Sequence, residues 1–573
     1  MKVAAGSSSS NASASSDAPP SPNRWSDIVW VAIVSAVVFF LFLGSRPLSN
    51  PDEGRYSEIP REMVASHDYV TPRLDGVKYF EKPPLLYWIS AAAFRAGGFN
   101  EWTARLGVAL FAMLGTVLVF LGARANFDRE TGFWSATILG TCLLYYGLSR
   151  VALLDLPIAV LMAAVLFTFQ IAIDLPVSNR RRALFWLMYA TMGLAVLTKG
   201  LIGFLLPGLV MAAWVALLNR WKDLRPFYPL SGSAILLAIA VPWHVLVARA
   251  NADFLYFYFV HEHFLRFTTN LHDRYQPWWY FLPVMIVGLF PWTIFLGQAV
   301  VSHLRGGWSA RSRNALSWFL LLWVVLVLGF FSKSQSKLIP YIAPIFPALA
   351  VLVASYLTRT LRTDTNVRGL RAGLWVFSGL CVVLGGALLF AKIPIKPVEL
   401  AVALHPWRLG LGIAFLAGAV AVGALTRARR LRAALVALVI TILPLNLSVN
   451  FIAGIADPRT TKTLALALKP RLQPGDAVYC LGNYSQDFPV YLDRLVDPVD
   501  FEGELEFGIH AEPEKAAPRF LNRDAFLARW HRPEPAYALV LRRDLARYFT
   551  SPLAPSAIVA QNARFLLLTN QTP

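Results

Sequence analysis

Apolar segments of about twenty residues recur along most of the chain, separated by short polar or turn-rich stretches. A helix of about twenty apolar residues spans the ~30 Å hydrocarbon core of a bilayer and satisfies its backbone hydrogen bonds internally. The pattern predicts about thirteen spans, at residues 27–46, 103–121, 132–149, 151–172, 183–198, 201–219, 230–250, 279–301, 314–331, 338–357, 372–390, 407–425 and 431–450. We therefore expect a polytopic, all-α membrane protein.

Composition and charge agree with this prediction and add an orientation. The chain is 56% hydrophobic, 15% charged and has a mean hydropathy of +0.51, which excludes an ordinary soluble protein. With the N-terminus inside, the inner loops hold most of the arginines, for example at 180–182, 359–371 and 427–432, as the positive-inside rule requires. The net charge of +19 therefore indicates membrane topology rather than a nucleic-acid partner. We expect a monomer surrounded by membrane lipids.

Three long segments lie outside the predicted spans, and this orientation places all of them on the outer side. Two are loops, at about 47–102 and 251–278, and the third is the C-terminal segment 451–573. In that segment DAVYCLGN and AYALVLRR read as strands and FLNRDAFLARW as a helix, so we expect a small α/β domain, a lid or scaffold without a catalytic signature. The Ser/Ala/Pro-rich residues 1–26 are typical of a disordered cytoplasmic tail.

The first outer loop opens with an unusual group of charges, NPDEGRYSEI at 50–59. A single charged group at a helix end usually only extends into the membrane interface, but Asp52 and Glu53 are adjacent and are followed by Arg55 and Tyr56. REMVAS then predicts an amphipathic helix along the membrane surface. These features favour a functional site over a simple interfacial anchor.

A second motif in the same loop is YFEKPPLLYW. Pro83 disfavours helical geometry at the preceding residue, so Glu81 and Lys82 should be extended just before a helix begins. The competing interpretation is a charged anchor beside the interfacial Tyr87 and Trp88.

Further polar residues are expected on this side of the membrane. Asp155 lies near the outer start of a span, and four residues lie at short outer turns: Lys199, Lys333, Lys337 and Tyr341. Each alone is explained by topology or helix capping. Because outer loops are otherwise poor in lysine, their shared location favours an anion site.

The stretch FYFVHEHFLRFTTNLHDRY supplies His261, Glu262 and His263 in the second outer loop. Together with Glu81 these side chains offer ligands for a divalent metal such as Zn or Mg. No specific metal motif is present, and an amphipathic surface helix with ordinary histidines is the stronger alternative.

These parts suit a lipid-linked sugar phosphate as donor. Arginine and lysine stabilise the charge that develops on a departing phosphate. A carboxylate activates or orients an acceptor, and aromatic rings such as Tyr56 and Tyr79 stack on a sugar or a polyprenyl chain. A nucleotide sugar would require a cytoplasmic domain, which the predicted topology lacks.

The quoted motifs also resemble a known family. DEGRYSEIPREMVAS, followed by YFEKPPLLYW, resembles the first outer loop of bacterial membrane glycosyltransferases of the protein O-mannosyltransferase-like group, which have the GT-C fold. EHFLRF (262–267) and SKLIPYIAP (336–344) fit the same group. Within it the sequence is most similar to the lipid A aminoarabinose transferases, the ArnT family. The resemblance covers about residues 27–450 and is weak beyond them, and its motifs are more specific for the group than for the substrate.

The resemblance implies transfer of aminoarabinose from undecaprenyl phosphate to a lipid A phosphate, on the periplasmic face of the bacterial inner membrane. This modification confers resistance to polymyxin and other cationic peptides. The predicted site consists of catalytic candidates (Asp52, Asp155, Glu53), substrate- or lipid-phosphate-binding residues (Arg55, Tyr56, Tyr79, Lys82, Lys199, Lys333, Lys337, Tyr341) and candidate metal ligands (Glu81, His263, His261).

Two alternatives stay open at this point. A related enzyme would glycosylate a protein or another glycan, and Asp52 would then be a true base. A lipid A phosphate is already ionised, so with that acceptor Asp52 would orient substrates or contact the sugar's ammonium group. The non-enzymatic alternative is a polyprenyl phosphate flippase, although the sequence lacks the repeated halves that many transporters show.

Overall fold

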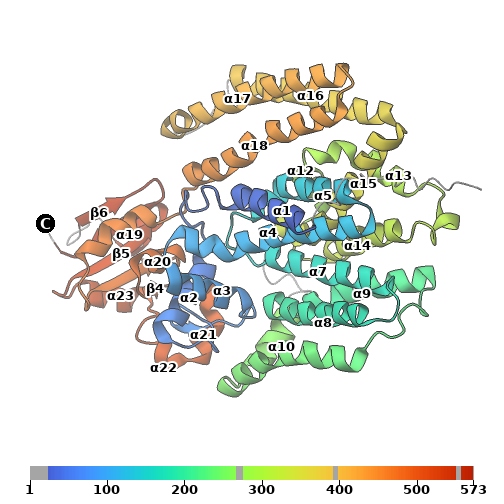
Figure 1. Cartoon of the computed structure of the whole chain (residues 1–573). Helices are drawn as coiled ribbons and strands as arrows, with labels where there is room; N and C mark the ends of the chain where they lie inside the picture. The colour runs from blue at the N-terminus through green and yellow to red at the C-terminus, as the bar shows by residue number, and fades with distance from the viewer. Residues whose placement is uncertain (1–23, 266–274, 392–397, 550–556, 572–573) are drawn as a thin grey trace, which may run out of the picture.

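The computed structural model describes residues 24–265, 275–391, 398–549 and 557–571, and within these ranges no side chains are described at 263–265 and 456. A helical bundle forms most of the chain, and a smaller α/β domain lies at one end of it (Figure 1). The helices of the first 303 residues, with the short strands of the first long loop, are α1 (Arg24–Phe40), α2 (Asp52–Ser66), β1 (Arg73–Leu74), β2 (Val77–Lys78), α3 (Leu85–Gly97), α4 (Glu101–Asn126), α5 (Arg129–Thr141), α6 (Leu143–Leu148), α7 (Asp155–Ile173), α8 (Asn179–Lys199), α9 (Ile202–Leu218), α10 (Pro229–Ala250), η1 (Tyr256–Leu265), α12 (Phe281–Gly288), η2 (Trp292–Phe295) and α13 (Leu296–His303).

The remaining bundle helices are η3 (Trp308–Ala310), α14 (Ala315–Lys333), η4 (Ile339–Ile345), α15 (Phe346–Thr363), α16 (Val367–Phe390), α17 (Val398–Arg427) and α18 (Leu431–Ala456). Each of the thirteen predicted spans coincides with one or more of these helices. By length and apolarity, eight of the described helices can cross a membrane, or nine if the pair α12 and η2–α13, bent by 105°, is one span. The others are shorter or carry charges; α1 and α9 have 17 residues each. The count of thirteen stays a prediction.

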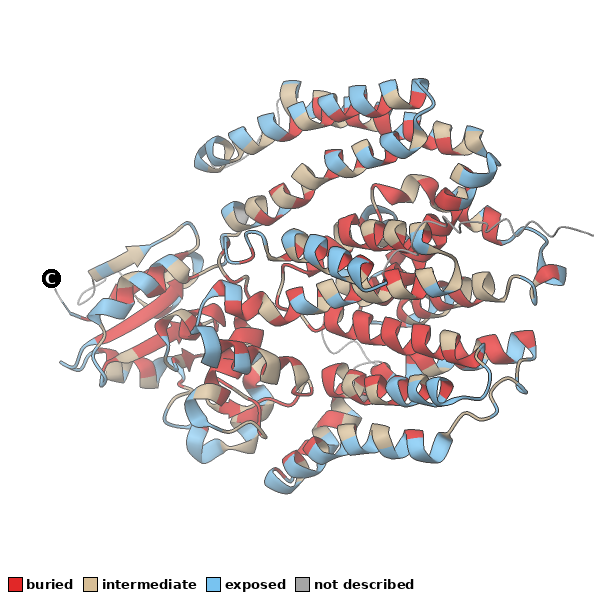
Figure 2. Cartoon of the chain, in the orientation of Figure 1, coloured by how far each residue is buried: buried red, intermediate tan, exposed pale blue. Residues whose placement is uncertain are grey.

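The bundle is built around α7 and α15. In the most apolar 18-residue stretch of each helix, 89% of the residues of α7 are buried and 94% of those of the continuous segment η4–α15. For α16 the share is only 33%. Figure 2 shows α7 almost wholly buried, and many exposed positions along α16 and α17. An apolar surface that is not covered by protein faces lipid in a membrane protein. We therefore place α16, α17 and α18 at the lipid-facing edge of the bundle.

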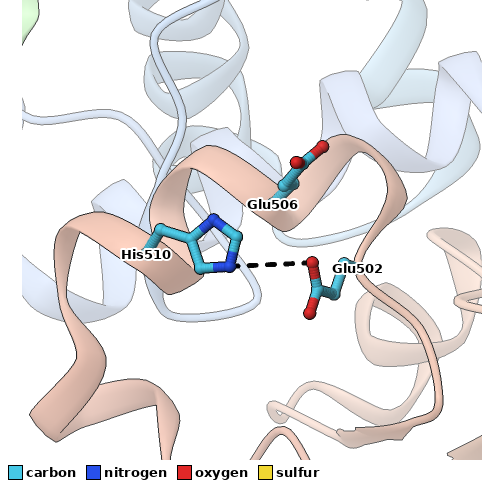
Figure 3. Close-up of side chains that lie close together, drawn as sticks. All are labelled: Glu502, Glu506 and His510. Carbon is cyan, nitrogen blue, oxygen red and sulfur yellow. Dashed lines mark ion pairs between the residues drawn. The ribbon is translucent and has the colours of Figure 1, made fainter.

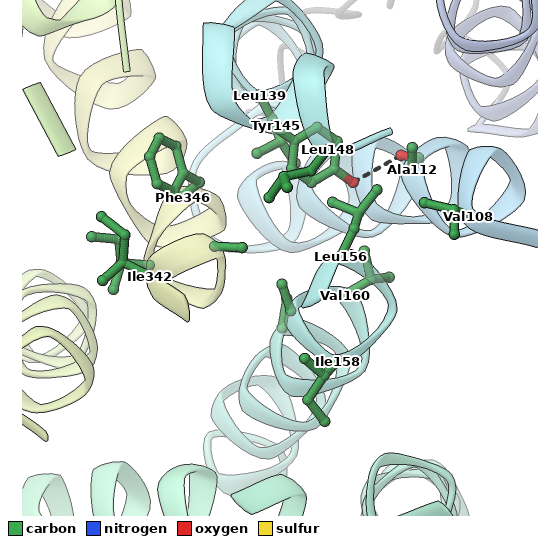
Figure 4. Close-up of a cluster of buried hydrophobic side chains, with 14 of the residues drawn as sticks. Val108, Ala112, Leu139, Tyr145, Leu148, Leu156, Ile158, Val160, Ile342 and Phe346 are labelled. Carbon is green, nitrogen blue, oxygen red and sulfur yellow. Dashed lines mark hydrogen bonds between the residues drawn. The ribbon is translucent and has the colours of Figure 1, made fainter. Parts of the chain in front are cut away.

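The centre of the bundle contains a tightly packed cluster where α4, α6, α7 and η4 meet (Figure 4). Within it the Tyr145 hydroxyl donates a hydrogen bond of 2.9 Å to the Ala112 carbonyl. The same hydroxyl lies 2.0 Å from where a Cβ on Gly115 would be, so only glycine fits there. Close packing of this kind holds the end of α7, and hence Asp155, at a fixed position.

The C-terminal domain contains a five-stranded sheet with the order β4-β3-β5-β7-β6. Its elements are α19 (Lys462–Leu468), η5 (Lys469–Arg471), β3 (Ala477–Leu481), α20 (Asp487–Leu492), β4 (Asp497–Val499), η6 (Gly503–Leu505), α21 (Glu506–Ala511), α22 (Pro513–Ala516), α23 (Arg523–Trp530), β5 (Ala536–Leu541), η7 (Arg542–Asp544), α24 (Leu545–Tyr548), β6 (Ala557–Gln561) and β7 (Phe565–Thr569). Strands β4, β3 and β5 are parallel, and β7 and β6 continue the sheet antiparallel. The expected strands β3 and β5 and the expected helix α23 are confirmed.

This domain is attached to the first long loop by buried polar contacts. The Asn50 amide donates to the Asp487 carboxylate, and the Asp487 N–H donates back to Asn50 Oδ1 at 2.9 Å. A second pair joins Arg519 to the fully buried Asp75 at 3.1 Å. Between these pairs α2 packs on α20 so closely that Gly54 lies against the Asp487 backbone.

The close approach at Gly54 gives a direct test of this attachment. A Cβ there would lie 2.5 Å from the Asp487 nitrogen, so Gly54→Ala forces the domain away from α2. We expect a loss of about 1–3 kcal/mol in stability, the usual cost of overpacking, measured by thermal unfolding in detergent, with faster proteolytic release of the domain. Gly379→Ala is the control, because its Cβ meets nothing within 4 Å. Equal stability of the two variants would contradict the described contact.

Candidate active site

Glu53 is the anchor of the first long loop. Its carboxylate has no exposed surface and lies 2.7 Å from both the Arg46 Nη1 and the Arg105 Nε. It also accepts hydrogen bonds of 3.0 Å from the backbone N–H groups of Ser49 and Ala152. Burial opposes ionisation, but the two arginines and these hydrogen bonds outweigh it and lower the pKa of Glu53 to about 2. The sequence predicts a catalytic role for Glu53, whereas this surrounding suits a residue that positions its neighbours.

Asp52 precedes Glu53 and begins α2. Half of its side chain is exposed, and its carboxylate lies 3.7 Å from the Arg55 guanidinium. The N-terminus of a helix carries partial positive charge, so this position also suits the binding of an anionic group. Asp52 is therefore a solvent-accessible carboxylate held beside a cation, as a reacting or orienting acid must be.

Arg55 lies between the bundle and the C-terminal domain. It forms an ion pair with Glu504 of that domain, and its guanidinium carbon lies 6.0 Å from the centre of the Tyr79 ring. Burial opposes its charge, but Tyr79, Glu504 and Glu81 outweigh burial and hold the pKa of Arg55 above its usual range. Its Nε is buried and has no hydrogen-bond partner among the described residues. An unused donor in a buried cation is an opening for an anionic ligand.

Three tyrosines form a wall beside Arg55. The rings of Tyr56 and Tyr87 stack at 5.9 Å, and Tyr79 is equally buried. Burial raises the pKa of all three phenols, so they stay protonated. The hydroxyls of Tyr79 and Tyr87 have no partner among the described residues. The three tyrosines thus place two buried hydroxyl groups, without partners among the described residues, close to Arg55.

Lys82 connects the first long loop to the second. Residues Glu81 and Lys82 precede α3 in non-helical backbone, as Pro83 predicts. The Lys82 Nζ donates to the Glu81 carbonyl at 2.6 Å and to Glu262 Oε2 at 3.2 Å. Glu262 belongs to η1, a π-helix of the second loop. The non-helical backbone expected before Pro83 is confirmed, and both residues lie in bends; the extended geometry stays a prediction.

Asp155 and Lys199 form a pair at the ends of α7 and α8. The Lys199 Nζ lies 2.5 Å from the Asp155 carboxylate and 4.9 Å from the centre of the Tyr341 ring. Asp155 also belongs to the charges that raise the pKa of Tyr56, together with Asp52. The structure therefore brings the start of α7 and the end of α8 together with Tyr341 of η4.

The remaining predicted residues are placed less centrally. Lys337 is buried and donates to the carbonyls of Gln276 (2.8 Å) and Ser334 (2.5 Å), and burial lowers its pKa. Lys333 is exposed. No contact joins either lysine to Asp52 or Arg55 in the described parts of the chain.

The candidate metal ligands are only partly described. His261 Nδ1 lies 3.7 Å from Glu262 Oε1, and the His261 ring stacks on Phe257 at 5.0 Å. The side chain of His263 lies outside the described residues, as do residues 266–274. The predicted group of Glu81, His261 and His263 therefore stays a prediction.

Sequence reasoning missed Glu504. This acid lies in the C-terminal domain, in GELEFGIH, which carries no recognisable motif. The segment turns one side to the site, because Phe507 packs on Phe257 at 3.9 Å and Gly508 fits against the Lys78 carbonyl. Burial raises the pKa of Glu504, and Arg55 opposes that rise.

The opposite side of this segment carries Glu502, Glu506 and His510 (Figure 3). Their ligand atoms lie within 4.8 Å of one another, and all three residues are exposed. His510 Nε2 is 3.8 Å from Glu502. No ion pair or hydrogen bond joins this cluster to Arg55 among the described residues, and we do not include it in the site.

Comparisons with known proteins agree with this geometry. The family model described as dolichyl-phosphate-mannose-protein mannosyltransferase matches residues 46–305, and the aminoarabinose transferase C-terminal domain model matches 464–570. The undecaprenyl phosphate-alpha-4-amino-4-deoxy-L-arabinose arabinosyl transferase of Pectobacterium atrosepticum is 31% identical, over 90% of this chain and 92% of its own. The chain belongs to this family, ArnT.

Further relatives cover almost the whole chain. The corresponding transferase of Pectobacterium carotovorum is 30% identical over 94% of this chain and 97% of its own. The crystal structure of ArnT from Cupriavidus metallidurans bound to undecaprenyl phosphate has a TM-score of 0.83 at 29% identity, with 96% of this chain and 99% of that chain covered. The protein is thus an integral-membrane, polyprenyl-phosphate-dependent glycosyltransferase of the GT-C fold, and the flippase alternative is set aside. The sequence motifs resembled the family only weakly beyond residue 450, but residues 464–570 match the model of the aminoarabinose transferase C-terminal domain.

The Glu53 pairing generates a prediction about stability and pH. Glu53→Gln leaves two buried arginines without a counter-charge, and we expect a loss of about 3–5 kcal/mol. The folded pKa lies below the ordinary value, so the pairing stabilises the protein above about pH 4.5 and this contribution is lost as pH falls through about 2. Thermal unfolding between pH 7 and pH 3 measures it.

The control for Glu53→Gln is Glu514→Gln, which changes an exposed glutamate of α22. A Glu53→Gln protein that melts at the temperature of this control at pH 7 would show that the pairing does not hold α2 in place.

Proposed function

We propose that the chain transfers 4-amino-4-deoxy-L-arabinose from undecaprenyl phosphate to a phosphate of lipid A, on the periplasmic face of the bacterial inner membrane. The observation that carries this proposal is the site under the C-terminal domain, where Asp52 and the largely covered Arg55 lie beside the three buried tyrosines. The similarity to the ArnT relatives, which are arabinosyl transferases of undecaprenyl phosphate-linked aminoarabinose, supports this sugar and its carrier. The orientation follows from the arginines of the opposite loops.

The donor phosphate is a good match for the cations of the site. Arg55 has an unused buried donor, and Lys82 and Lys199 lie on neighbouring elements. In the reaction an oxygen of the acceptor phosphate forms a bond to C1 of the sugar. The bond from C1 to the undecaprenyl phosphate oxygen breaks, and that phosphate leaves with the electron pair. Cations near the leaving phosphate lower the barrier by stabilising its new charge.

The acids have a different task. A phosphate acceptor is already ionised, so Asp52 does not need to remove a proton. We assign Asp52 to orienting the sugar and stabilising the positive charge that develops at its ring. Asp155 holds Lys199 in place through their 2.5 Å contact. Glu504, close to Arg55, adds a buried carboxylate that suits the ammonium group of the sugar.

A divalent cation is a further part of the proposal. Glu81 precedes Lys82, which contacts Glu262 of the second loop, and His261 lies beside the same glutamate. Carboxylate and imidazole groups suit zinc. Glu81, His261 and His263 would hold such an ion, which would tie the two loops together rather than take part in the transfer.

A second candidate function is transfer to a protein hydroxyl. The match of residues 46–305 to the protein mannosyltransferase model favours it. A hydroxyl must lose its proton, so Asp52 would then act as a base and the rate would fall in acid. With a phosphate acceptor no proton has to be removed, so protonation of Asp52 as a base would not slow the transfer in acid.

Mass spectrometry of lipid A from cells that express the chain tests the main proposal. We expect an aminoarabinose increment in the wild type and a decrease of at least about 100-fold in Asp52→Asn, because charge stabilisation by one group contributes about 10²–10³ in rate. Asp524→Asn changes an exposed acid of α23 and serves as the control. Unmodified lipid A in the wild type, with the donor present and normal expression, would contradict the proposal.

A further inference from the structure

A cavity of about 260 Å³ lies among α16, α17 and α18, far along the chain from the residues described so far. Its apolar walls come from Leu388, Leu404, Leu411 and Ile452, and its two basic residues are His405 and Arg408. We call it the Arg408 pocket. It lies at the lipid-facing edge of the bundle, where α16 is mostly uncovered.

Arg408 has no counter-charge in this pocket. It lies ten residues after the start of α17 at Val398, about 15 Å along the helix. Its Nε is buried and without a hydrogen bond, and no acid pairs with it among the described residues. A cation in a membrane helix is costly unless an anion or water reaches it, and the pocket gives such a group access to Arg408.

The pocket is linked to the active-site region by a chain of contacts. The Trp407 ring stacks on Phe451 at 4.8 Å, and Phe451 packs on Phe42 at 5.2 Å. One turn further along α18, Gly454 lies against the Arg46 side chain, and Arg46 pairs with Glu53. Figure 1 shows the same ends of α17 and α18 turned toward the C-terminal domain. A ligand in the pocket therefore lies at the same end of the bundle as Asp52.

We propose that the Arg408 pocket binds a phosphate group of the acceptor lipid, with an acyl chain along its apolar walls. This inference rests on the proposed function and assigns the acceptor a place that the proposal leaves open. The proposed function assigns Arg55, Lys82 and Lys199 to the donor phosphate, and among the described residues neither Arg55 nor Lys199 forms an ion pair or hydrogen bond with α16–α18. A guanidinium binds phosphate in a bidentate fork, which a lysine cannot reproduce. The apolar walls favour a lipid over a free phosphate ion.

Initial-rate kinetics with purified protein, donor, and lipid A in phosphatidylglycerol vesicles test the pocket. We expect Arg408→Gln to raise the KM for lipid A about tenfold, the effect of losing one charge-assisted hydrogen bond, with kcat and the donor KM unchanged. Arg408→Lys keeps the positive charge but cannot bind phosphate in a bidentate fork. Its KM for lipid A should lie between those of the wild type and Arg408→Gln. Arg427→Gln, at the opposite end of the same helix and exposed, is the matched control.

Two further measurements separate the sources of the phosphate. In native mass spectrometry, Arg408→Gln should lose bound lipid A and keep bound phosphatidylglycerol, and excess inorganic phosphate should leave the lipid A KM unchanged. Equal loss of both lipids would make the pocket a general phospholipid site, and competition by inorganic phosphate would make it a free-anion site; either result overturns the proposal.

Kinetic outcomes also decide between this inference and the proposed function. An unchanged lipid A KM in a folded Arg408→Gln protein contradicts the pocket alone. A wild-type protein that transfers no sugar to lipid A contradicts the proposed function itself. Wild-type melting temperatures for Arg408→Gln and Arg408→Lys confirm that the comparison is between folded proteins.

Discussion

The pairing of Glu53 with Arg46 and Arg105 is the interaction on which the site depends. It ties the start of α2 to α4 and to the segment before α7 through one fully buried carboxylate. Helix geometry then orients the rest, because residues three and four apart share a face and the next residue does not. With Glu53 directed into the protein, Asp52 and Arg55 share a different face, toward the C-terminal domain. A buried charge pair thus sets the direction of the exposed acid.

The site is completed by a part of the chain that is distant in sequence. The bundle contributes Asp52, Arg55 and the Asp155–Lys199 pair, and the C-terminal domain contributes Glu504. Contacts such as that of Arg519 with the buried Asp75 attach the C-terminal domain to the first long loop, so the domain has a defined position over the site. Its carboxylate pairs with Arg55, and the Arg55 Nε has no hydrogen-bond partner in the part of the chain that the structure describes.

Local patterns in the sequence predicted the features that depend on neighbouring residues alone, namely the positions of helices and strands and the backbone before a proline. Apolar runs predicted the positions of the bundle helices, Pro83 predicted the non-helical backbone at Glu81 and Lys82, and the patterns of apolar residues predicted β3 and β5. The contact between Arg55 and Glu504 joins residues with no shared motif, and only the folded chain brings them together. Likewise, nothing in the sequence distinguishes buried Glu53 from half-exposed Asp52, because adjacent helical residues face different surroundings.

The proposed reaction breaks a bond between a sugar and undecaprenyl phosphate. A single reaction of purified protein, donor and lipid A in which both products are quantified tests it. We expect one free undecaprenyl phosphate for each aminoarabinose that appears on a lipid A phosphate, and no release without acceptor. An intact donor after prolonged incubation with acceptor, or sugar attached to a hydroxyl instead of a phosphate, would contradict it.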